Sequence, residues 1–441
     1  MKEFFNKFKD IYRHEELRNK IGYTLLLLLV YRIGSFIVLP GIDAGALKQE
    51  EEEGLLAFLG LFTGGAFSRA SIFALGVMPY ISASIVIQLL GLAVPSIQKL
   101  QKEGESGRKK ITQWTRYLTI AIAVVQAPSY ITQYVPDAAR PDTMFWTISA
   151  TLILTASTLF VMWLGERITD RGIGNGTSLI IMTGIISDIP RGIYSEATSQ
   201  TIFFFLIELA FLVVIIGAVV AITQAIRRIP VQMARQANSG SMLPQGEGAR
   251  SYIPLRVNSA GVMPIIFAQA IMFIPALLQN SEGLQDSKIL QSLTDIQGLG
   301  YNLLLFVMII LFTFFYTAIV TNPNQIADDL KKNGNYVPGV KPGKDTAEFI
   351  DRVLSNITLP GGIFVALIAI LPAVVMIVGL TKTQMFGQFF GGTSLLITVG
   401  VILDLLQQIE SHLLSRHYDG LMKSGRVRGR NQTAISSGYT S

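Results

Sequence analysis

Long apolar runs constrain this sequence more than any other feature, because about 20 apolar residues are needed to cross the roughly 30 Å hydrocarbon core of a bilayer. Ten runs approach or exceed that length, and the fifth is the shortest. Each is predicted to form a membrane-spanning helix; the runs are 21–39, 70–94, 117–134, 145–164, 179–193, 201–226, 260–278, 301–320, 357–380 and 391–414. The predicted fold is therefore an all-α polytopic membrane protein with ten transmembrane helices.

The composition agrees with a membrane environment. Half of the residues are hydrophobic, 15% are charged and the mean hydropathy is +0.46, whereas a soluble protein of this length would carry about 25% charged residues. The absence of cysteine excludes disulfides, thiolate metal sites and a cysteine nucleophile. His412 and His417 are five residues apart, which is a poor helical spacing for a shared ligand. We therefore predict no metal site.

Basic residues are distributed very unevenly among the connections between the spans. If the N-terminus is placed in the cytoplasm, 29 of the 36 lysines and arginines fall on the cytoplasmic side and six on the other, while Arg32 lies inside a span. This asymmetry follows the positive-inside rule and fits an even number of spans. Both termini are therefore predicted to face the cytoplasm.

Two cytoplasmic connections, 227–259 and 322–356, are too long to be simple turns. Long loops are usually either functional or disordered. Both contain apolar residues at regular intervals and turn signals such as Val337-Pro338-Gly339. We expect ordered structure that protrudes from the membrane; a flexible linker is the alternative.

A half-length apolar segment, 55–67, reads LLAFLGLFTGGAF and is too short to span. It is consistent with an interfacial helix, a re-entrant segment or a cap over a cavity, and Gly64-Gly65 would separate it from the next span. Spans one to five and six to ten form two halves of similar length. The predicted division is an amphipathic cytoplasmic segment 1–20, an N-terminal half 21–200, a C-terminal half 201–414 and a cytoplasmic tail 415–441.

No pattern typical of an enzyme is present in the sequence. Gly343-Lys344 resembles the end of a phosphate-binding loop, but Pro338 stands where the first glycine belongs. The glycine-rich stretch 172–176 lacks the third glycine of a dinucleotide fingerprint and opens an apolar span, so we interpret it as a tight turn. We predict no catalytic residues and no cofactor, and any energy source must be a partner or an ion gradient.

The predicted spans contain few ionisable residues, namely Arg32, Asp188, Glu208 and Asp404. Such residues are functional by default, because a charge in lipid is costly. Asp188 lies near a predicted membrane boundary. Arg32 and Asp404 lie deeper, and each is either a structural partner for a backbone group or another helix, or a coupling site.

Several segments in family order resemble the bacterial SecY family. GGAFSRASIFALGVMPYISASIVIQLL, residues 64–90, is similar to the plug and second span of that family. ELRNKIGYTLLLLLVYRIGSFIVLPGID resembles its first span, ERITDRGIGNGTSLII the start of the fifth, LRVNSAGVMPIIFA the start of the seventh and FGGTSLLITVGVILD the tenth. The resemblance implies two pseudo-symmetric five-helix halves that close like a clamshell around an hourglass pore, with a short helix as a plug.

The same resemblance implies site residues that periodicity could not have selected, since isoleucines four apart usually only pack. The implied pore ring is Ile81, Ile85, Ile181, Ile185, Ile266 and Ile397. The implied plug residues are Leu55, Leu56, Phe58, Leu59, Leu61, Phe62, Gly64 and Gly65. Gln88 and Asn258 would lie at the lateral gate, either bonded to each other or to local backbone groups. The implied motor and ribosome docking residues are Arg227, Arg228, Arg250, Arg256, Lys341 and Lys344. At Lys341 the family usually has arginine, so the bidentate fork is lost.

The function that the resemblance implies is that of a non-enzymatic channel. It would translocate unfolded secretory proteins across the bacterial inner membrane and release membrane-protein segments sideways into lipid. The implied partners are SecE, SecG, the SecA motor ATPase, the ribosome, signal-bearing preproteins, SecDF, YidC and membrane lipid. The main alternative is an ion-coupled secondary transporter of a small solute, which does not account for the long basic loops. An insertase or scaffold without a pore is a third interpretation.

Overall fold

The computed structural model describes residues 14–43, 45, 47, 60, 63–233, 251–279, 288–295 and 298–423. The α-helices are α2 (Glu15–Gly34), α4 (Met78–Ala93), α5 (Pro95–Lys102), α6 (Glu105–Tyr134), α7 (Met144–Arg171), α8 (Gly176–Ser199), α9 (Ile202–Thr223), α10 (Met263–Gln279), α11 (Lys288–Thr294), α12 (Leu299–Val320), α13 (Pro323–Lys332), α14 (Lys344–Ile377), α15 (Gln384–Gly387) and α16 (Gly392–Lys423). Two 3-10 turns are η1 (Asp137–Ala139) and η2 (Gln388–Phe390), and the strands are β1 (Ile226–Met233), β2 (Ser251–Arg256) and β3 (Asn335–Tyr336).

In this described part of the chain, ten helices have 16 residues or more, and each overlaps one of the ten predicted spans. Five of them, α7, α9, α12, α14 and α16, contain stretches long and apolar enough to cross a membrane by themselves. The clearest difference from the sequence prediction is α14, which begins at Lys344 rather than at 357. Its first turns lie outside the apolar run because they pack on a small sheet rather than in lipid.

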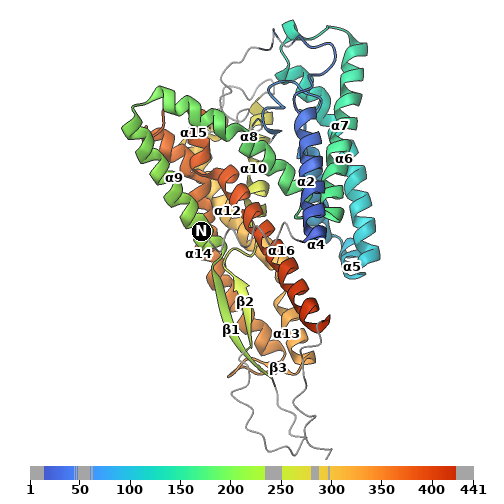
Figure 1. Ribbon diagram of the computed structural model, residues 1–441, viewed down its shortest axis with the longest axis vertical. Helices are drawn as coiled ribbons and strands as arrows, with labels where there is room; N and C mark the ends of the chain where they lie inside the picture. The colour runs from blue at the N-terminus through green and yellow to red at the C-terminus, as the bar shows by residue number, and fades with distance from the viewer. Residues whose placement is uncertain are drawn as a thin grey trace, which may run out of the picture.

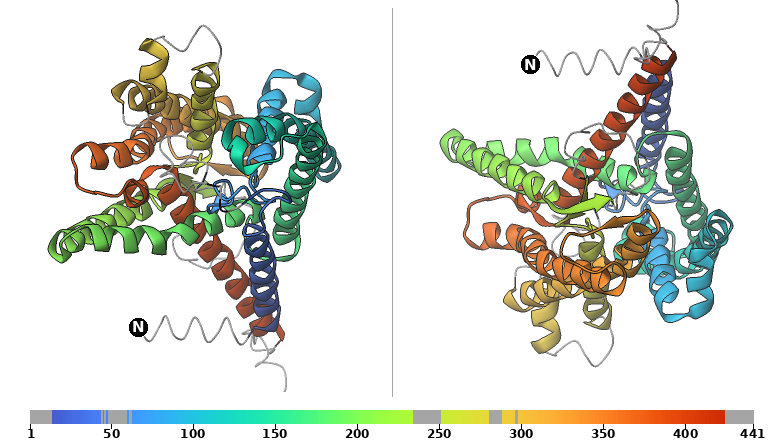
Figure 2. Two further views of the ribbon diagram at one scale, coloured as in Figure 1. Left: turned by 90° about the horizontal axis from the view of Figure 1, so that it is seen from above. Right: turned by 90° about the horizontal axis from the view of Figure 1, so that it is seen from below.

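Figures 1 and 2 show two groups of long helices that meet at α8. The first group packs through α2 on α7, α4 on α6 and α6 on α7, and the second through α10 on α12, α12 on α14 and α14 on α16. Helix α8 contacts α7 and α2 on one side and α16, α15 and α9 on the other. It therefore belongs to the packing of both groups.

At one end of the molecule the long connections form a three-stranded antiparallel sheet in the order β2-β1-β3 (Figure 1). Ile229 of β1 pairs with Ile253 of β2, and the face that includes Ile229 and Leu255 packs on Ile350 and Leu354 of α14. The expected ordered structure is thus confirmed for 226–233, 251–259 and 322–356, whereas 234–250 lies outside the described residues. The strands themselves are an addition to the predicted all-α class.

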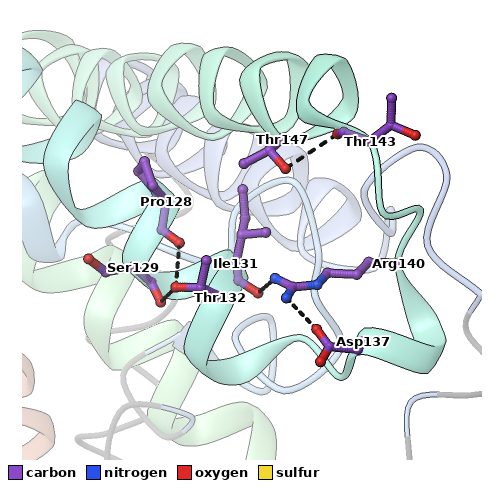
Figure 3. Close-up of polar contacts among 8 residues, drawn as sticks. All are labelled: Pro128, Ser129, Ile131, Thr132, Asp137, Arg140, Thr143 and Thr147. Atoms are coloured by element: carbon purple, nitrogen blue, oxygen red, sulfur yellow. Dashed lines mark hydrogen bonds and ion pairs between the residues drawn. The ribbon is translucent and has the colours of Figure 1, made fainter. Parts of the chain in front are cut away.

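The α6–α7 connection at the other end is held by a basic side chain. Arg140 donates to the carbonyl of Ile131 at 2.6 Å and forms an ion pair with Asp137, so it satisfies a carbonyl in the last turn of α6 (Figure 3). Trp146 of α7 donates from Nε1 to the carbonyl of Pro40 at 2.8 Å. These contacts fix the ends of α2, α6 and α7 relative to one another.

The core consists of one large apolar cluster and two smaller ones. The large cluster includes buried residues from α2, α7, α8, α9, α10, α12, α14 and α16. A second cluster lies around Phe67, Tyr130 and Leu154, and the third lies under the sheet. The predicted pore ring falls in the large cluster.

Candidate pore collar and plug base

The six isoleucines implied as a pore ring come from four helices. Ile81 and Ile85 lie on α4, Ile181 and Ile185 on α8, Ile266 on α10 and Ile397 on α16. Ile181, Ile185 and Ile397 are buried, with exposed fractions of 3%, 2% and 1%. Ile81, Ile85 and Ile266 are partly buried against the same large cluster. The structure therefore brings all six into one apolar cluster, which also contains many other residues. Their arrangement as a pore ring, or collar, stays a prediction.

The base of the predicted plug is described from residue 63 onward. Gly64 and Gly65 have φ values of +62° and +73°, a left-handed conformation that glycine adopts without steric cost. A Cβ on Gly64 would lie 2.7 Å from Nη1 of Arg32 and 2.9 Å from Cα of Gly184 in α8. The predicted break at these glycines is present, whereas the predicted plug residues Leu55, Leu56, Phe58, Leu59, Leu61 and Phe62 lie outside the described residues.

Two arginines converge on the carbonyl oxygen of Gly64. Arg32 donates from Nη1 at 2.9 Å and Arg69 donates from Nη2 at 2.8 Å. Both guanidinium groups lie over the ring of Phe36, 4.7 and 4.6 Å from its centroid. We call this arrangement of Arg32, Arg69 and the Gly64 carbonyl the basic clamp. It agrees with the interpretation of Arg32 as a structural partner of a backbone group.

A second contact holds the same segment against α6. Tyr130 donates its hydroxyl to the carbonyl of Phe67 at 2.6 Å, and its ring lies edge-on to that of Phe67 with centroids 4.8 Å apart. Tyr130 is buried and belongs to the second apolar cluster. The segment that follows the plug is therefore fixed to α2 and α6 within four residues.

The two residues predicted to lie at the lateral gate, Gln88 and Asn258, do not bond to each other in this structure. Gln88 on α4 donates from Nε2 to the hydroxyl of Ser84 at 3.1 Å. Asn258 is 9% exposed, and its Oδ1 is buried without a hydrogen-bond partner. A buried polar atom without a partner is costly, and neither of the two predicted arrangements is present at Asn258 Oδ1.

The docking residues that are described lie at the sheet end of the molecule and are exposed. Arg227 and Arg228 lie on β1, Arg256 ends β2, and Lys341 and Lys344 precede or begin α14. Arg256 donates from Nη2 to Oε1 of Gln407 in α16 at 2.8 Å, which ties the sheet to that helix. Arg250 lies outside the described residues.

The other ionisable residues of the predicted spans lie in different environments. Asp404 is exposed on α16, and Asp188 is half-buried on α8. Glu208 is 1% exposed on α9 and accepts from Nε2 of Gln200 at 2.7 Å.

Glu196, a fully buried carboxylate on α8, was not among the residues predicted from the sequence. Its two oxygens accept from the backbone N–H groups of Lys382 and Thr383, each at 2.9 Å, and from the Thr383 hydroxyl. We call this group the acidic clamp. It was missed because the predicted fifth span ended at 193, before Glu196, whereas α8 continues to Ser199. The sequence after Pro190 contains no clear helix stop signal before Ser199, and this could have indicated that the helix continues through Glu196.

Comparison with known proteins defines the family. The SecY family model matches residues 71–406. The protein translocase subunit SecY of Thermotoga maritima is 39% identical over 439 residues, which cover 96% of this chain and 99% of the relative. The chain belongs to the SecY family. SecY of Vibrio cholerae is 40% identical, with 94% and 96% covered.

Solved structures agree with the fold of the SecY family. One described as the structure of a protein conducting channel superposes with a TM-score of 0.62 at 16% identity, covering 93% of this chain and 94% of the other. Sec61 in a canine ribosome-channel complex gives a TM-score of 0.58 at 16% identity, with the same shares covered. The predicted resemblance and the polytopic helical fold are confirmed, and the chain is a multi-pass membrane protein of a translocase family rather than an enzyme.

Proposed function

We propose that this chain is the protein-conducting channel subunit of a Sec translocase. It lets unfolded secretory proteins cross the membrane and lets apolar segments of membrane proteins leave sideways into lipid. The observation that carries the proposal is full-length identity of about 40% to curated translocase subunits. These relatives do not support the alternative of a small-solute transporter.

The proposed conduction site is the collar of Ile81, Ile85, Ile181, Ile185, Ile266 and Ile397. A narrow apolar constriction loses water and resists ions, yet it binds a passing polypeptide weakly. The packing of all six in one cluster that includes residues of α4, α8, α10 and α16, with three of them buried and three partly buried, supports this role. Segment 55–67 is the proposed plug, and Gln88 and Asn258 mark the proposed lateral gate.

The proposed division into halves is 21–200 and 201–414, with 1–20 and 415–441 on the cytoplasmic side. The uneven distribution of lysine and arginine supports an orientation with both termini in the cytoplasm of a bacterial cell and the sheet on that side. The exposed basic residues there, Arg227, Arg228, Arg256, Lys341 and Lys344, with Arg250, form the proposed docking surface for SecA and the ribosome. Basic side chains suit the phosphates of ribosomal RNA.

The proposed partners beyond docking are SecE, SecG, signal-bearing preproteins, SecDF, YidC and membrane lipid. Such partners would supply the energy and the lateral support that the chain itself does not provide. The relative described as Sec61 in a ribosome-channel complex supports a ribosome as one of them.

Reconstitution tests the proposed function. The chain is placed in proteoliposomes with SecE and SecG, and SecA, ATP and a signal-bearing preprotein are added. We expect the preprotein to become protected from protease, and a photo-reactive residue at position 81 to crosslink to a stalled chain. A matched probe at Val125, which is 70% exposed on α6, should not crosslink. No protection with ATP, or equal crosslinking at both positions, would contradict the proposal.

A further inference from the structure

Glu196 is a charged side chain placed where no water reaches it. Its exposed fraction is 0%, and in the described part of the chain no lysine, arginine or histidine forms an ion pair with it. A buried carboxylate is tolerated when its oxygens are hydrogen-bonded. Here the bonds come from Lys382 N, Thr383 N, Thr383 Oγ1 and Gln200 Nε2. Four donors on one carboxylate indicate a contact of above-average strength, because charge-assisted hydrogen bonds are the strong ones.

The acidic clamp joins parts of the chain that are far apart in sequence. Glu196 lies near the end of α8, whereas Lys382 and Thr383 form the turn between α14 and α15. Three of the four donors belong to that turn, and the fourth, Gln200, follows α8 directly. The carboxylate therefore holds the proposed N-terminal half to the proposed C-terminal half beside the point where the chain passes from one to the other.

A close approach one turn earlier on α8 extends this contact. A Cβ on Gly192 would lie 2.9 Å from the ring of Phe389, so the absence of a side chain there lets the segment pack against α8. Phe386 and Phe389 are buried, and Phe386 also packs on Phe390 with ring centroids 5.3 Å apart. Residues i and i+4 of a helix share a face. Gly192 and Glu196 thus present one continuous face of α8 to residues 382–389.

Half of the proposed collar lies on α8 and on the long helix that follows the clamped turn. Ile181 and Ile185 lie on α8, and Ile397 lies five residues into α16, which begins at Gly392, nine residues after Thr383 and beyond α15 and η2. Glu196 is eleven residues past Ile185, about 16 Å along a helix. Pro190 lies between them and has no N–H for the carbonyl of Ile186, which is where a helix bends most easily. The clamp thus fixes the outer part of α8 beyond its weakest point.

We propose that Glu196 is a positioning residue for the resting state of the channel. By binding the turn at Lys382 and Thr383, its carboxylate holds the segment that leads into α16 against α8 and so keeps Ile397 in register with Ile181 and Ile185. This inference rests on the proposed function, since a register between collar residues matters only in a channel. Loss of the clamp favours the open arrangement without removing any collar side chain.

Glu208 provides a matched comparison within the same region. It is also a buried carboxylate and also accepts from Gln200, but no described contact joins it to residues 382–383, and its Oε2 is buried without a partner. Replacing Glu208 therefore removes a buried carboxylate and leaves the turn bonded. Replacing Glu196 removes a buried carboxylate and releases the turn.

The experiment compares Glu196→Gln, Glu208→Gln and wild type in proteoliposomes with equal amounts of channel. Two quantities are measured: the resting ion leak, and the ratio of translocation of a preprotein with a defective signal to that with an intact signal. For Glu196→Gln we expect both to rise roughly tenfold, since losing a charge-assisted hydrogen bond shifts a two-state ratio by about that factor. For Glu208→Gln we expect both to stay within about twofold of wild type.

Several outcomes are decisive. If Glu196→Gln transports the intact preprotein but keeps wild-type leak and ratio, or if Glu208→Gln changes as much as Glu196→Gln, the positioning role is wrong while the proposed function stands. If wild type itself transports nothing, the proposed function fails instead. If Glu196→Gln does not accumulate in membranes, Thr383→Val decides: it keeps the carboxylate and removes the hydroxyl donor, and an unchanged ratio in that variant overturns the inference.

Discussion

The two clamps use opposite chemistry, one on a segment that lies against α8 and the other on α8 itself. In the basic clamp, cationic side chains of Arg32 and Arg69 hold a backbone carbonyl, and that carbonyl belongs to Gly64, which lies against Gly184 of α8. In the acidic clamp, the anionic Glu196 of α8 holds backbone N–H groups. One clamp acts before Pro190 and the other after it. Helix α8 thus lies against the base of the proposed plug on one side of Pro190 and binds the turn before α15 on the other.

The clamps differ in their access to water. Arg32 and Arg69 are half-buried, and Phe36, on which they lie, is 56% exposed. Glu196 is fully buried. Because salt and water weaken exposed charges much more than buried ones, the basic clamp is the one that can be released at low cost. The base of the proposed plug is therefore held less tightly than the junction of the proposed halves.

We expect the most destabilising substitution to be one at the base of the proposed plug. Gly64→Ala forces a left-handed residue, at about 1–2 kcal/mol, and also places a Cβ within 2.9 Å of Gly184 Cα. The control Gly334→Ala has a similar φ of +66° but meets no atom within 4 Å. We expect the unfolding free energy to fall by about 3 kcal/mol for Gly64→Ala, because overpacking adds about 1–3 kcal/mol, and by about 1 kcal/mol for the control. Thermal unfolding in detergent, followed by near-ultraviolet circular dichroism, measures both.

Equal shifts for the two glycine variants would mean that the contact between Gly64 and α8 contributes nothing. The basic clamp would then not hold the base of the proposed plug against α8, and the two clamps would differ only in how deeply their side chains are buried.

An intermediate effect is expected from the two arginines. Arg32→Gln and Arg69→Gln each leave one donor on the Gly64 carbonyl, whereas the double variant leaves a buried acceptor without a partner, so the double loss should exceed the sum by about 1 kcal/mol. The chain has no cysteine, so a single Ala66→Cys at a 0% exposed position reports plug-base opening by its labelling rate with maleimide. We expect the labelling rate to rise with salt when Ala66→Cys is the sole substitution, and to be insensitive to salt when it is combined with both arginine substitutions.

Additive losses in these variants would show that the arginines act independently. A labelling rate that does not depend on salt in the chain with Ala66→Cys alone would contradict the inference that the basic clamp is released more easily than the acidic clamp. Arg18→Gln, an exposed residue at the other end of α2, serves as the control for a general loss of positive charge.

The sequence was sufficient for the spans and insufficient for the clamps. Apolar runs located all ten long helices, because burial in lipid leaves a compositional record in each run separately. Apolar runs do not predict the part of α14 before 357, because charged residues lie between its buried residues Ile350 and Leu354, which pack on the sheet. They also do not predict β1, whose buried Ile229 and Val231 alternate over too few residues to stand out.

The candidate site divides in the same way. Gly64 and Gly65 were predicted as a break, since glycine pairs are local signals. That Arg32 and Arg69 meet at the Gly64 carbonyl depends on tertiary packing between residues up to 37 apart, and the bond from Glu196 to Thr383 spans 187 residues. No periodicity carries such information. The pore ring entered through family resemblance, and it remains a prediction.

The smallest expected effect is at a charge pair that is neither buried nor attached to a backbone group. Arg116 of α6 binds Glu166 of α7 through two bonds, at 3.0 and 2.6 Å, with Arg116 46% exposed, and the bond raises the pKa of Arg116. Arg116→Lys keeps the charge but loses the fork. We expect the unfolding free energy to change by less than about 1 kcal/mol, as for other surface pairs. A loss as large as that of Gly64→Ala would show that burial does not rank these contacts.

Helix α14 has a mechanical consequence for the whole molecule. It is 34 residues long, about 51 Å, and its first turns pack on the sheet while its later turns lie in the large cluster. Load applied at the sheet therefore travels along one rod instead of through a chain of loops. Pro360 and Pro372 each remove a backbone hydrogen bond, so the helix bends most easily at these two points. The bending stiffness at these two points sets how far a push from outside the bilayer reaches toward the turn at Thr383.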